Sequence, residues 1–320
     1  MKLDTSNKQG MGIIAATFAY ILWGLLPAYW KLVEKVPAFE ILAHRILWAF
    51  VFMIALLLVT GKVKSYLTEL KEIIQDWKKL VSMILASILI SVNWCTYIWA
   101  VNNNHIIETS LGYYINPLVS VLLGIVVLKE RLTFWQYMGI LLALIGVLNI
   151  TLHFGTVPWI ALSLAISFGL YGLVKKTVKL GSVTGITTET LLVCPIALLY
   201  LGMLHNQGSG FFDFSVSAIP FLLMGAGVVT AVPLILFASG AQRLPLTIVG
   251  LLQYIAPTIA LILGVSLYKE SFTSVHLVSF SFIWSALILF SLAKTKPLLQ
   301  LEALLFKKAF WKTKEPHKNF

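Results

Sequence analysis

Tyr114–Thr133 reads YINPLVSVLLGIVVLKERLT, and Tyr254–Thr273 reads YIAPTIALILGVSLYKESFT. The two stretches have the same length, and at an offset of 140 residues they share eight of twenty positions. Each is a long apolar run with a proline near its start and a Lys-Glu pair at its end. A segment that occurs twice at a fixed distance defines an internal repeat. The chain therefore consists of two related halves.

The composition places the chain in a membrane. Hydrophobic residues make up 59% of the sequence and charged residues only 12%, and the mean hydropathy is +0.89. Soluble domains are far less apolar. The net charge of +11 could indicate a nucleic-acid partner, but the charges lie between apolar runs, where phospholipid headgroups would be. We therefore expect the protein to lie in a lipid bilayer and to bind no nucleic acid.

A membrane-spanning helix needs about 20 mostly apolar residues. This criterion predicts an all-α integral membrane protein with ten transmembrane helices. We divide the chain into an N-terminal segment (1–10), a first half (11–152), a second half (158–293) and a basic tail (294–320). The predicted spans are residues 11–30, 38–60, 81–101, 106–128, 134–152, 158–174, 184–203, 219–240, 246–268 and 274–293.

The distribution of basic residues predicts the orientation. Connections on one side of the predicted spans, together with both termini, carry 20 of the 24 Lys and Arg residues, and those on the other side carry three. The remaining basic residue, Arg45, falls inside a span. Cytoplasmic connections are enriched in Lys and Arg, so both termini are expected in the cytoplasm. Between residues 62 and 79, apolar residues recur at helical spacing, which predicts an amphipathic helix on the inner leaflet or a solvated linker.

The repeat predicts two inverted halves. The duplicated run is the fourth span and again the ninth, so each half contains five spans, and an odd number inverts the second half. A weaker match supports this division, because Ile21–Lys31 aligns with Ile166–Lys176 at an offset of 145 residues. Inverted repeats recur in secondary transporters, where two halves rock about a site near the membrane midplane.

Several stretches of the first half resemble a known family. They are LWGLLPAYWK, AHRILWAF, WCTYIWAVN, TSLGYYINPLVSVLLG and LKERLTFWQYMGILLALIGV. They are similar to the EamA branch of the drug/metabolite transporter superfamily and, within it, to RarD-type permeases, over about residues 12–292. The resemblance implies a ten-helix transporter of the bacterial inner membrane, built from two inverted EamA repeats. RarD-type proteins are described as permeases linked to chloramphenicol sensitivity, a phenotype that does not name a substrate.

Arg45 lies about seven residues into the second span, roughly 10 Å from its end at 1.5 Å per residue. An arginine inside a membrane is costly and should face protein or water and have a partner. Glu108, at a similar depth in the fourth span, is the expected partner. The two residues either form a substrate-binding and coupling pair or an ion pair that only joins two helices.

Three further titratable residues are candidates for proton coupling. Glu40 and His44 are four residues apart and therefore lie on one face of the second span. A histidine can change its charge near physiological pH. Alternatively, Glu40 lies in the outer headgroups, and His44 is a hydrogen-bonded packing residue, as a lone histidine on a helix more often is. Glu189 occupies the position equivalent to His44 at the offset of 145 residues, and is the acid of the second half that we expect to matter.

Aromatic and amide residues gather in the spans around Arg45. Aromatic walls with a few polar groups can bind a small solute, whereas the same residue types also form interface belts and join helices. Pro117 and Pro257 each remove a backbone donor and are expected to kink their spans. With Arg45, the candidate binding residues are Trp23, Asn93, Trp94, Tyr97, Tyr113, Asn116, Gln253 and Tyr254.

These features favour a secondary transporter of a small molecule, present as a monomer or homodimer. The alternatives are a channel, a membrane sensor without transport activity or an intramembrane enzyme. The sequence contains no Walker, HExxH or GxSxG motif, so we expect neither ATP hydrolysis nor enzymatic activity. Cys95 and Cys194 fall in apolar runs without metal-ligand spacing, so no metal site and no cofactor are expected.

Overall fold

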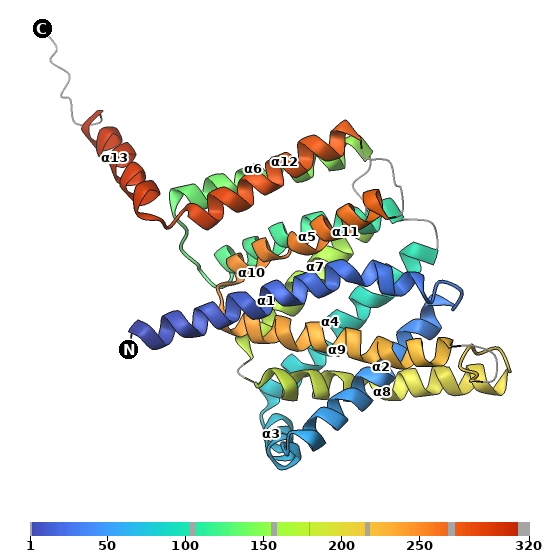
Figure 1. Cartoon of the computed structure of the whole chain (residues 1–320). Coiled ribbons are helices and arrows are strands. Elements are labelled where there is room, and N and C mark those ends of the chain that lie inside the picture. Colours follow the sequence, from blue (N-terminus) through green and yellow to red (C-terminus); the bar gives the residue numbers. More distant parts are fainter. Residues whose placement is uncertain are drawn as a thin grey trace, which may run out of the picture. The chain divides into compact units, whose positions relative to one another are not determined.

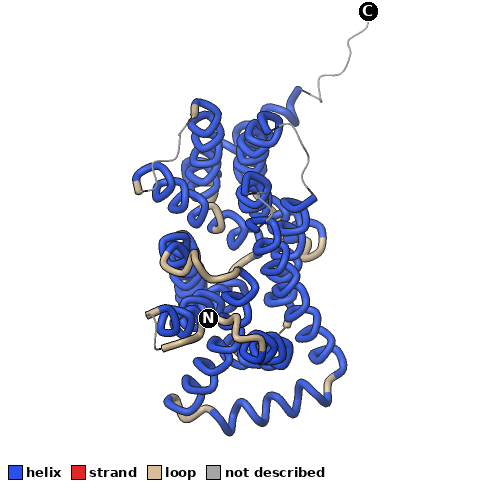
Figure 2. The backbone as a smooth tube through the Cα atoms, turned by 90° about the vertical axis from the view of Figure 1, so that its right-hand side faces the viewer, coloured by secondary structure: helices blue, strands red, loops and turns tan. Residues whose placement is uncertain are grey.

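The computed structural model describes residues 2–102, 106–154, 159–178, 180–214, 218–267 and 273–312. Every regular element in these residues is a helix, which confirms the all-α class (Figures 1 and 2). Helices suit a membrane because they satisfy their own backbone hydrogen bonds. They are α1 (Lys2–Lys31), α2 (Ala38–Val59), α3 (Val63–Gln75), α4 (Trp77–Asn102), α5 (Ile106–Val126), α6 (Phe134–Phe154), α7 (Trp159–Thr177), α8 (Ser182–Asn206), α9 (Ile219–Arg243), α10 (Leu246–Leu252), α11 (Ile255–Ser266), α12 (Ser274–Leu292) and α13 (Lys296–Lys312).

Within the described residues, nine helical stretches are long and apolar enough to cross a membrane. They coincide with nine of the ten predicted spans. The other predicted span, residues 106–128, corresponds to α5, in which Gly112–Val126 forms a shorter apolar segment. The multi-pass, all-α prediction is confirmed at this level, and the count of ten remains a prediction. The amphipathic connection between the second and third predicted spans is helical, as its spacing predicts, and forms α3.

The two copies of the duplicated segment are entered differently. α5 runs unbroken from Ile106 through Pro117 to Val126, whereas in the second half a break at Gln253 and Tyr254, where the second copy begins, separates α10 from α11. At the junction, the Tyr254 N–H donates to the Leu251 carbonyl and the Ala256 N–H to the Gln253 carbonyl, so the turn is tightened into i→i−3 bonds. Pro257 lies in the first turn of α11, where its missing N–H costs little.

The chain divides into two compact units, and the larger contains α1 to α5 and α7 to α11. Its helix contacts come in matching pairs. α1 packs against α9 and α11, and its equivalent in the second half, α7, packs against α4 and α5 (Figure 1). α2 packs against α8, its own equivalent. This pattern is expected of two related halves that exchange equivalent contacts.

One contact occurs twice in this unit. A Cβ added to Gly24 of α1 would lie 2.7 Å from Cβ of Ile259, and one added to Gly169 of α7 would lie 2.8 Å from Cγ1 of Val119. The two glycines are 145 residues apart and their partners 140 residues apart, which are the offsets of the sequence repeat. The absence of a side chain lets α1 approach α11, and α7 approach α5, at equivalent positions.

The smaller unit contains α6, α12 and α13. α6 and α12 are antiparallel, and the Asn149 side-chain amide of α6 donates to Ser279 Oγ of α12 over 2.8 Å. The indole N–H of Trp135, at the start of α6, donates to the Leu298 carbonyl of α13 over 2.8 Å. These bonds attach the C-terminal helix to its own unit.

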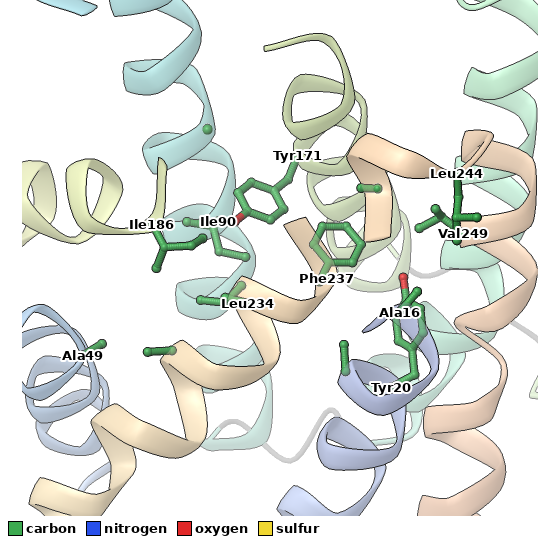
Figure 3. Close-up of a cluster of buried hydrophobic side chains, with 14 of the residues drawn as sticks. Ala16, Tyr20, Ala49, Ile90, Tyr171, Ile186, Leu234, Phe237, Leu244 and Val249 are labelled. Atoms are coloured by element: carbon green, nitrogen blue, oxygen red, sulfur yellow. The ribbon is translucent and has the colours of Figure 1, made fainter. Parts of the chain in front are cut away.

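Aromatic side chains join the two halves inside the larger unit. Phe237 of α9 stacks on Tyr171 of α7, with ring centroids 5.9 Å apart, and meets the edge of Tyr20 of α1 at 6.2 Å (Figure 3). All three side chains are at most 2% exposed. Each brings a large apolar area into a close-packed interior. The cluster therefore fixes α1, α7 and α9 beside the cavity described next.

Candidate functional site

The larger unit contains a partly open cavity of about 180 Å³ between helices of both halves. Eight of the nine predicted binding residues line it, and Tyr254 does not, because its side chain is 1% exposed and packed in the core. Pro257 also lines the cavity, whereas Pro117 does not. The predicted residues that the structure brings together are Trp23, Arg45, Asn93, Trp94, Tyr97, Tyr113, Asn116 and Gln253.

Arg45 projects from α2 into this cavity. Its Nε donates to Thr230 Oγ1 of α9 over 3.1 Å. Its guanidinium carbon lies 4.6 Å from the ring centroid of Trp30 and 4.9 Å from that of Trp94. Contacts of a cation with aromatic faces are strongest where water is excluded. One hydrogen bond and two rings thus hold the guanidinium, and its other N–H groups make no hydrogen bond to the described residues.

No Asp or Glu lines the cavity among the residues that the structure describes. The side chain of Glu108, the predicted partner of Arg45, lies outside the described part of the chain. The tyrosines Tyr97 and Tyr113 lie near the guanidinium, and their ring centroids are 5.9 Å apart. The described wall therefore presents Arg45 as a cation among aromatic rings and neutral polar groups.

The amides of the wall use part of their hydrogen-bonding capacity for helix packing. Asn93 donates to the Leu164 carbonyl over 2.9 Å, and Gln253 donates to Ser120 Oγ over 3.0 Å. The oxygens Oδ1 of Asn116 and Oε1 of Gln253 are buried and make no hydrogen bond to the described residues, although the Tyr20 hydroxyl lies near the Gln253 amide. Buried polar atoms normally have partners, so these two carbonyl oxygens are acceptors that a ligand or water can use.

Glu40 and His44 lie outside the cavity wall. Glu40 is 1% exposed, and its Oε1 accepts a hydrogen bond of 2.6 Å from the Phe211 N–H, in the segment after α8. His44 is 4% exposed and stacks on Phe212, with ring centroids 4.8 Å apart. Although Arg45 follows His44 directly, successive residues of a helix point about 100° apart. The two residues therefore form a separate site on another face of α2.

Glu189 of α8 is fully paired. Its Oε1 lies 2.6 Å from Nζ of Lys175, and its Oε2 accepts a hydrogen bond of 2.9 Å from the Tyr171 hydroxyl. Both members of the ion pair are buried, with 5% and 4% of their side chains exposed. Since Tyr171 also belongs to the aromatic cluster, this ion pair adjoins the packed core and not the cavity wall.

Comparison with known families agrees with the helical repeat. The EamA-like transporter family matches twice, over residues 10–152 and 156–292. The chain belongs to the EamA-like transporter family.

Curated relatives of this EamA-like transporter match along nearly their whole length. It is 50% identical to "Uncharacterized transporter YojE" of Bacillus subtilis (strain 168) over 89% of its own chain and 95% of the relative. It is 42% identical to "Protein RarD" of Escherichia coli (strain K12), with the same coverages. A more distant relative, 26% identical over 88% of the chain and 93% of that protein, is "Chloramphenicol-sensitive protein RarD" of Pseudomonas aeruginosa. The resemblance to RarD-type permeases is confirmed.

A solved structure, titled "Crystal structure of protein", shares the fold of this EamA-like transporter. The TM-score is 0.69 at 18% sequence identity, and the match covers 90% of this chain and 99% of the other. The family and its curated relatives are transporters, which fits the expectation of a protein that is not an enzyme.

Sequence reasoning missed several residues of the cavity wall. Phe168 lies 145 residues after Trp23, and the two rings are 5.6 Å apart, so the repeat alone could have identified it. Trp30, one of the rings beside Arg45, lies on the same helix as Trp23, seven residues later. Thr230 is the only hydroxyl in the apolar stretch VVTAVPL, and nothing in its spacing relates it to Arg45.

Proposed function

We propose that this EamA-like transporter moves a small organic solute across the bacterial cell membrane by alternating access, with the Arg45 cavity as its substrate site. The observation that carries the proposal is the guanidinium of Arg45 in an aromatic cavity whose described lining residues include no acid. A cation inside a membrane protein requires a compensating partner. A ligand with a negative charge supplies that partner and forms strong charge-assisted hydrogen bonds.

Arg45 requires a negatively charged group, whereas the amide oxygens of the cavity wall require hydrogen-bond donors. Asn116 and Gln253 contribute carbonyl oxygens without a hydrogen-bond partner among the described residues, and these oxygens accept hydrogen bonds only. A solute with an anionic group at Arg45 and a donor group, such as an ammonium, at the two amides satisfies both ends. The proposed substrate is therefore an anionic or zwitterionic metabolite.

The size of the cavity favours a small solute. Sites for drug-sized ligands usually have volumes of about 300–1,000 Å³, and this cavity has about 180 Å³. Aromatic rings such as Trp23 and Phe168 cover the apolar part of a ligand from the two halves. A metabolite of modest size fits this cavity better than a large drug does.

The proposed membrane arrangement has ten spans, two inverted halves and both termini in the cytoplasm of the bacterial cell. Its support is the excess of basic residues in the connections on one side and the matched packing of the halves. Alkaline phosphatase is active only outside the cytoplasm. Fused after Gly208 it should be active, and fused after Gly61 or at the C-terminus it should be inactive. Activity at Gly61 would contradict the orientation.

The substrate site can be tested by ligand-induced stabilisation. Purified protein is heated with a panel of anionic, zwitterionic, cationic and neutral metabolites, and ligands that raise the unfolding temperature are then tested for uptake into proteoliposomes. We expect anionic or zwitterionic compounds to stabilise the wild type, and Arg45→Ala to lose at least tenfold in affinity. Arg243→Ala is the matched control, because Arg243 is exposed and bonds to Ser239 on its own helix. Unchanged affinity in Arg45→Ala would reject the site.

A further inference from the structure

Three side chains of α2, Glu40, His44 and Trp48, follow one another at intervals of four residues. They therefore share one face of the helix. Four of their polar atoms are buried and have no hydrogen-bond partner among the described residues: Oε2 of Glu40, Nδ1 and Nε2 of His44, and Nε1 of Trp48. Buried polar atoms without partners are rare, so a cluster of them requires an explanation, such as a bound water or ion or a functional role. We call these three residues the α2 polar column.

The segment that follows α8 covers the α2 polar column. The backbone N–H of Phe211 donates to Glu40 Oε1 over 2.6 Å. The ring of Phe212 stacks on His44 at 4.8 Å, with an angle of 24° between the planes, and lies 6.1 Å from the ring of Trp48. The two phenylalanines are 39% and 37% exposed. One layer of residues thus separates the column from its surroundings at that end of the larger unit.

Other titratable groups near Glu40 come from several elements. On α2 itself, Nε2 of His44 lies 4.0 Å from Glu40 Oε1. From α8, Tyr200 is close enough to interact electrostatically with Glu40. Arg45 is turned toward Thr230 of α9 and the cavity, and Asp213 of the covering segment is exposed. Among the described residues, His44 is therefore the one basic group paired with the Glu40 carboxylate. The other groups named here are neutral, acidic or turned away from it.

The second half provides an internal comparison. Glu189 aligns with His44 in the repeat, but both of its oxygens are occupied, by Lys175 and by the Tyr171 hydroxyl. That acid is neutralised within the protein. Glu40 has one oxygen without a hydrogen-bond partner among the described residues, and His44 Nε2 lies 4.0 Å from its other oxygen.

We propose that Glu40 and His44 form a proton-binding site, separate from the Arg45 cavity, which controls how the Gln207–Phe214 segment is held and so couples transport to a proton gradient. The coupling part rests on the proposed function, whereas the proton site does not. A proton fits better than a metal ion, because no group of three or more His, Cys, Asp or Glu suited to a metal occurs among the described residues.

The binding step transfers a proton from hydronium to Oε2 of Glu40, the oxygen without a partner. An O–H bond forms, water returns to the solvent, and the carboxylate becomes a neutral acid. His44 lies near enough to take or relay the proton. The hydrogen bond from the Phe211 N–H then loses its charge assistance and weakens. Protonation thereby loosens the covering segment from α2.

A path connects this segment to the cavity. The ring of Phe214 meets that of Phe221, in the first turn of α9, with centroids 5.3 Å apart. Further along α9, Thr230 accepts the hydrogen bond from Arg45. The α2 polar column and Arg45 also share one helix. A change in the covering segment therefore acts on both helices that position the guanidinium.

Charge movement after a rapid pH change, recorded from substrate-free proteoliposomes on a solid-supported membrane, tests the proton site directly. Wild type should give a transient current from proton binding, and Glu40→Gln, which keeps the size and the acceptor oxygen, should reduce it at least tenfold. Glu34→Gln is the matched control, because Glu34 is an exposed acid paired with Lys31. It should behave as wild type. A wild-type current in Glu40→Gln would overturn the proposal.

His44→Gln provides a second test that keeps Glu40 in place and decides the matter if Glu40→Gln does not fold. It should shift the pH of half-maximal current by about one unit or more, and an unchanged midpoint would overturn the proposal. Hydrogen exchange of the peptide containing Phe211, corrected for the intrinsic rate, should accelerate on acidification in wild type and lose this response in Glu40→Gln. Because no substrate is present, these results are independent of ligand binding at Arg45. Failure of the ligand panel alone would reject the substrate site and leave the proton site standing.

Discussion

Gly227 of α9 lies directly against the backbone of Trp48 of α2. A Cβ added to Gly227 would lie 2.5 Å from the carbonyl oxygen of Trp48, a distance that side-chain rearrangement cannot relieve because the obstacle is backbone. One turn further along α9, Thr230 bonds to Arg45. The close approach at Gly227 therefore sets the spacing of the two helices that position the guanidinium.

Gly227→Ala should destabilise the protein. Alanine is ordinarily favoured over glycine inside a helix by about 1 kcal/mol, but here the added methyl group forces α9 away from α2, and overpacking costs about 1–3 kcal/mol. We expect a lower unfolding temperature in detergent and weaker ligand binding, because Thr230 moves with α9.

The matched control is Gly202→Ala, since an added Cβ at Gly202 of α8 would meet no atom within 4 Å. This variant should be as stable as wild type or slightly more stable. Equal stability of the two variants would show that the α2–α9 contact is looser than the structure has it.

Thr230→Val should impair the site and leave the fold largely intact. Valine keeps the shape of threonine but cannot accept the hydrogen bond from Arg45 Nε. A buried donor left without a partner costs about 1–3 kcal/mol or more when charged. The guanidinium should therefore reorient, and ligand affinity should fall by roughly tenfold, since 1.4 kcal/mol corresponds to a factor of ten.

A suitable control for this variant is Thr187→Val. Thr187 of α8 is fully buried, and its hydroxyl donates only to the Val183 carbonyl of its own helix. Titration of each variant with a ligand identified by the thermal panel gives the comparison. Equal affinities in the two valine variants would remove Thr230 from the site.

The repeat accounts for how much of the fold the sequence could predict. Apolar runs and their duplication define the helices, because a helix in lipid must be long, apolar and internally hydrogen-bonded. The repeat even relates contacts, as Gly24 with Ile259 and Gly169 with Val119 demonstrate. The break between α10 and α11 was not predicted at its position, since it falls at Gln253 and Tyr254, ahead of Pro257, and α5 has no break before the equivalent Pro117.

For the site, residue types in the sequence indicated which side chains line the cavity, but the sequence did not indicate which residues contact each other. Arg45 and its aromatic neighbours stand out because charge and large rings are rare inside spans. Tyr254 was expected in the cavity, but it follows Gln253 directly and so points to a different side of the helix junction. Partners such as Lys175 for Glu189, or Phe211 for Glu40, come from other elements of the chain, and no local pattern indicates them.

Lys175→Met should destabilise the protein strongly. Its partner Glu189 is 4% exposed and would be left as a buried charge bonded only to Tyr171. Removing one member of a buried ion pair costs about 3–5 kcal/mol, whereas replacing both by apolar residues of similar size is often nearly neutral. The double variant Lys175→Met with Glu189→Leu should therefore recover most of the lost stability.

The exposed pair Lys31–Glu34 is the control, because its side chains are 59% and 54% exposed and Lys31→Met should cost no more than about 1 kcal/mol. Chemical unfolding in detergent of wild type, Lys175→Met, Glu189→Leu and the double variant, analysed as a double-mutant cycle, gives the coupling energy. If the double variant is less stable than Lys175→Met alone, then the two residues do not act as a pair. Glu189 is then again a second candidate for proton coupling.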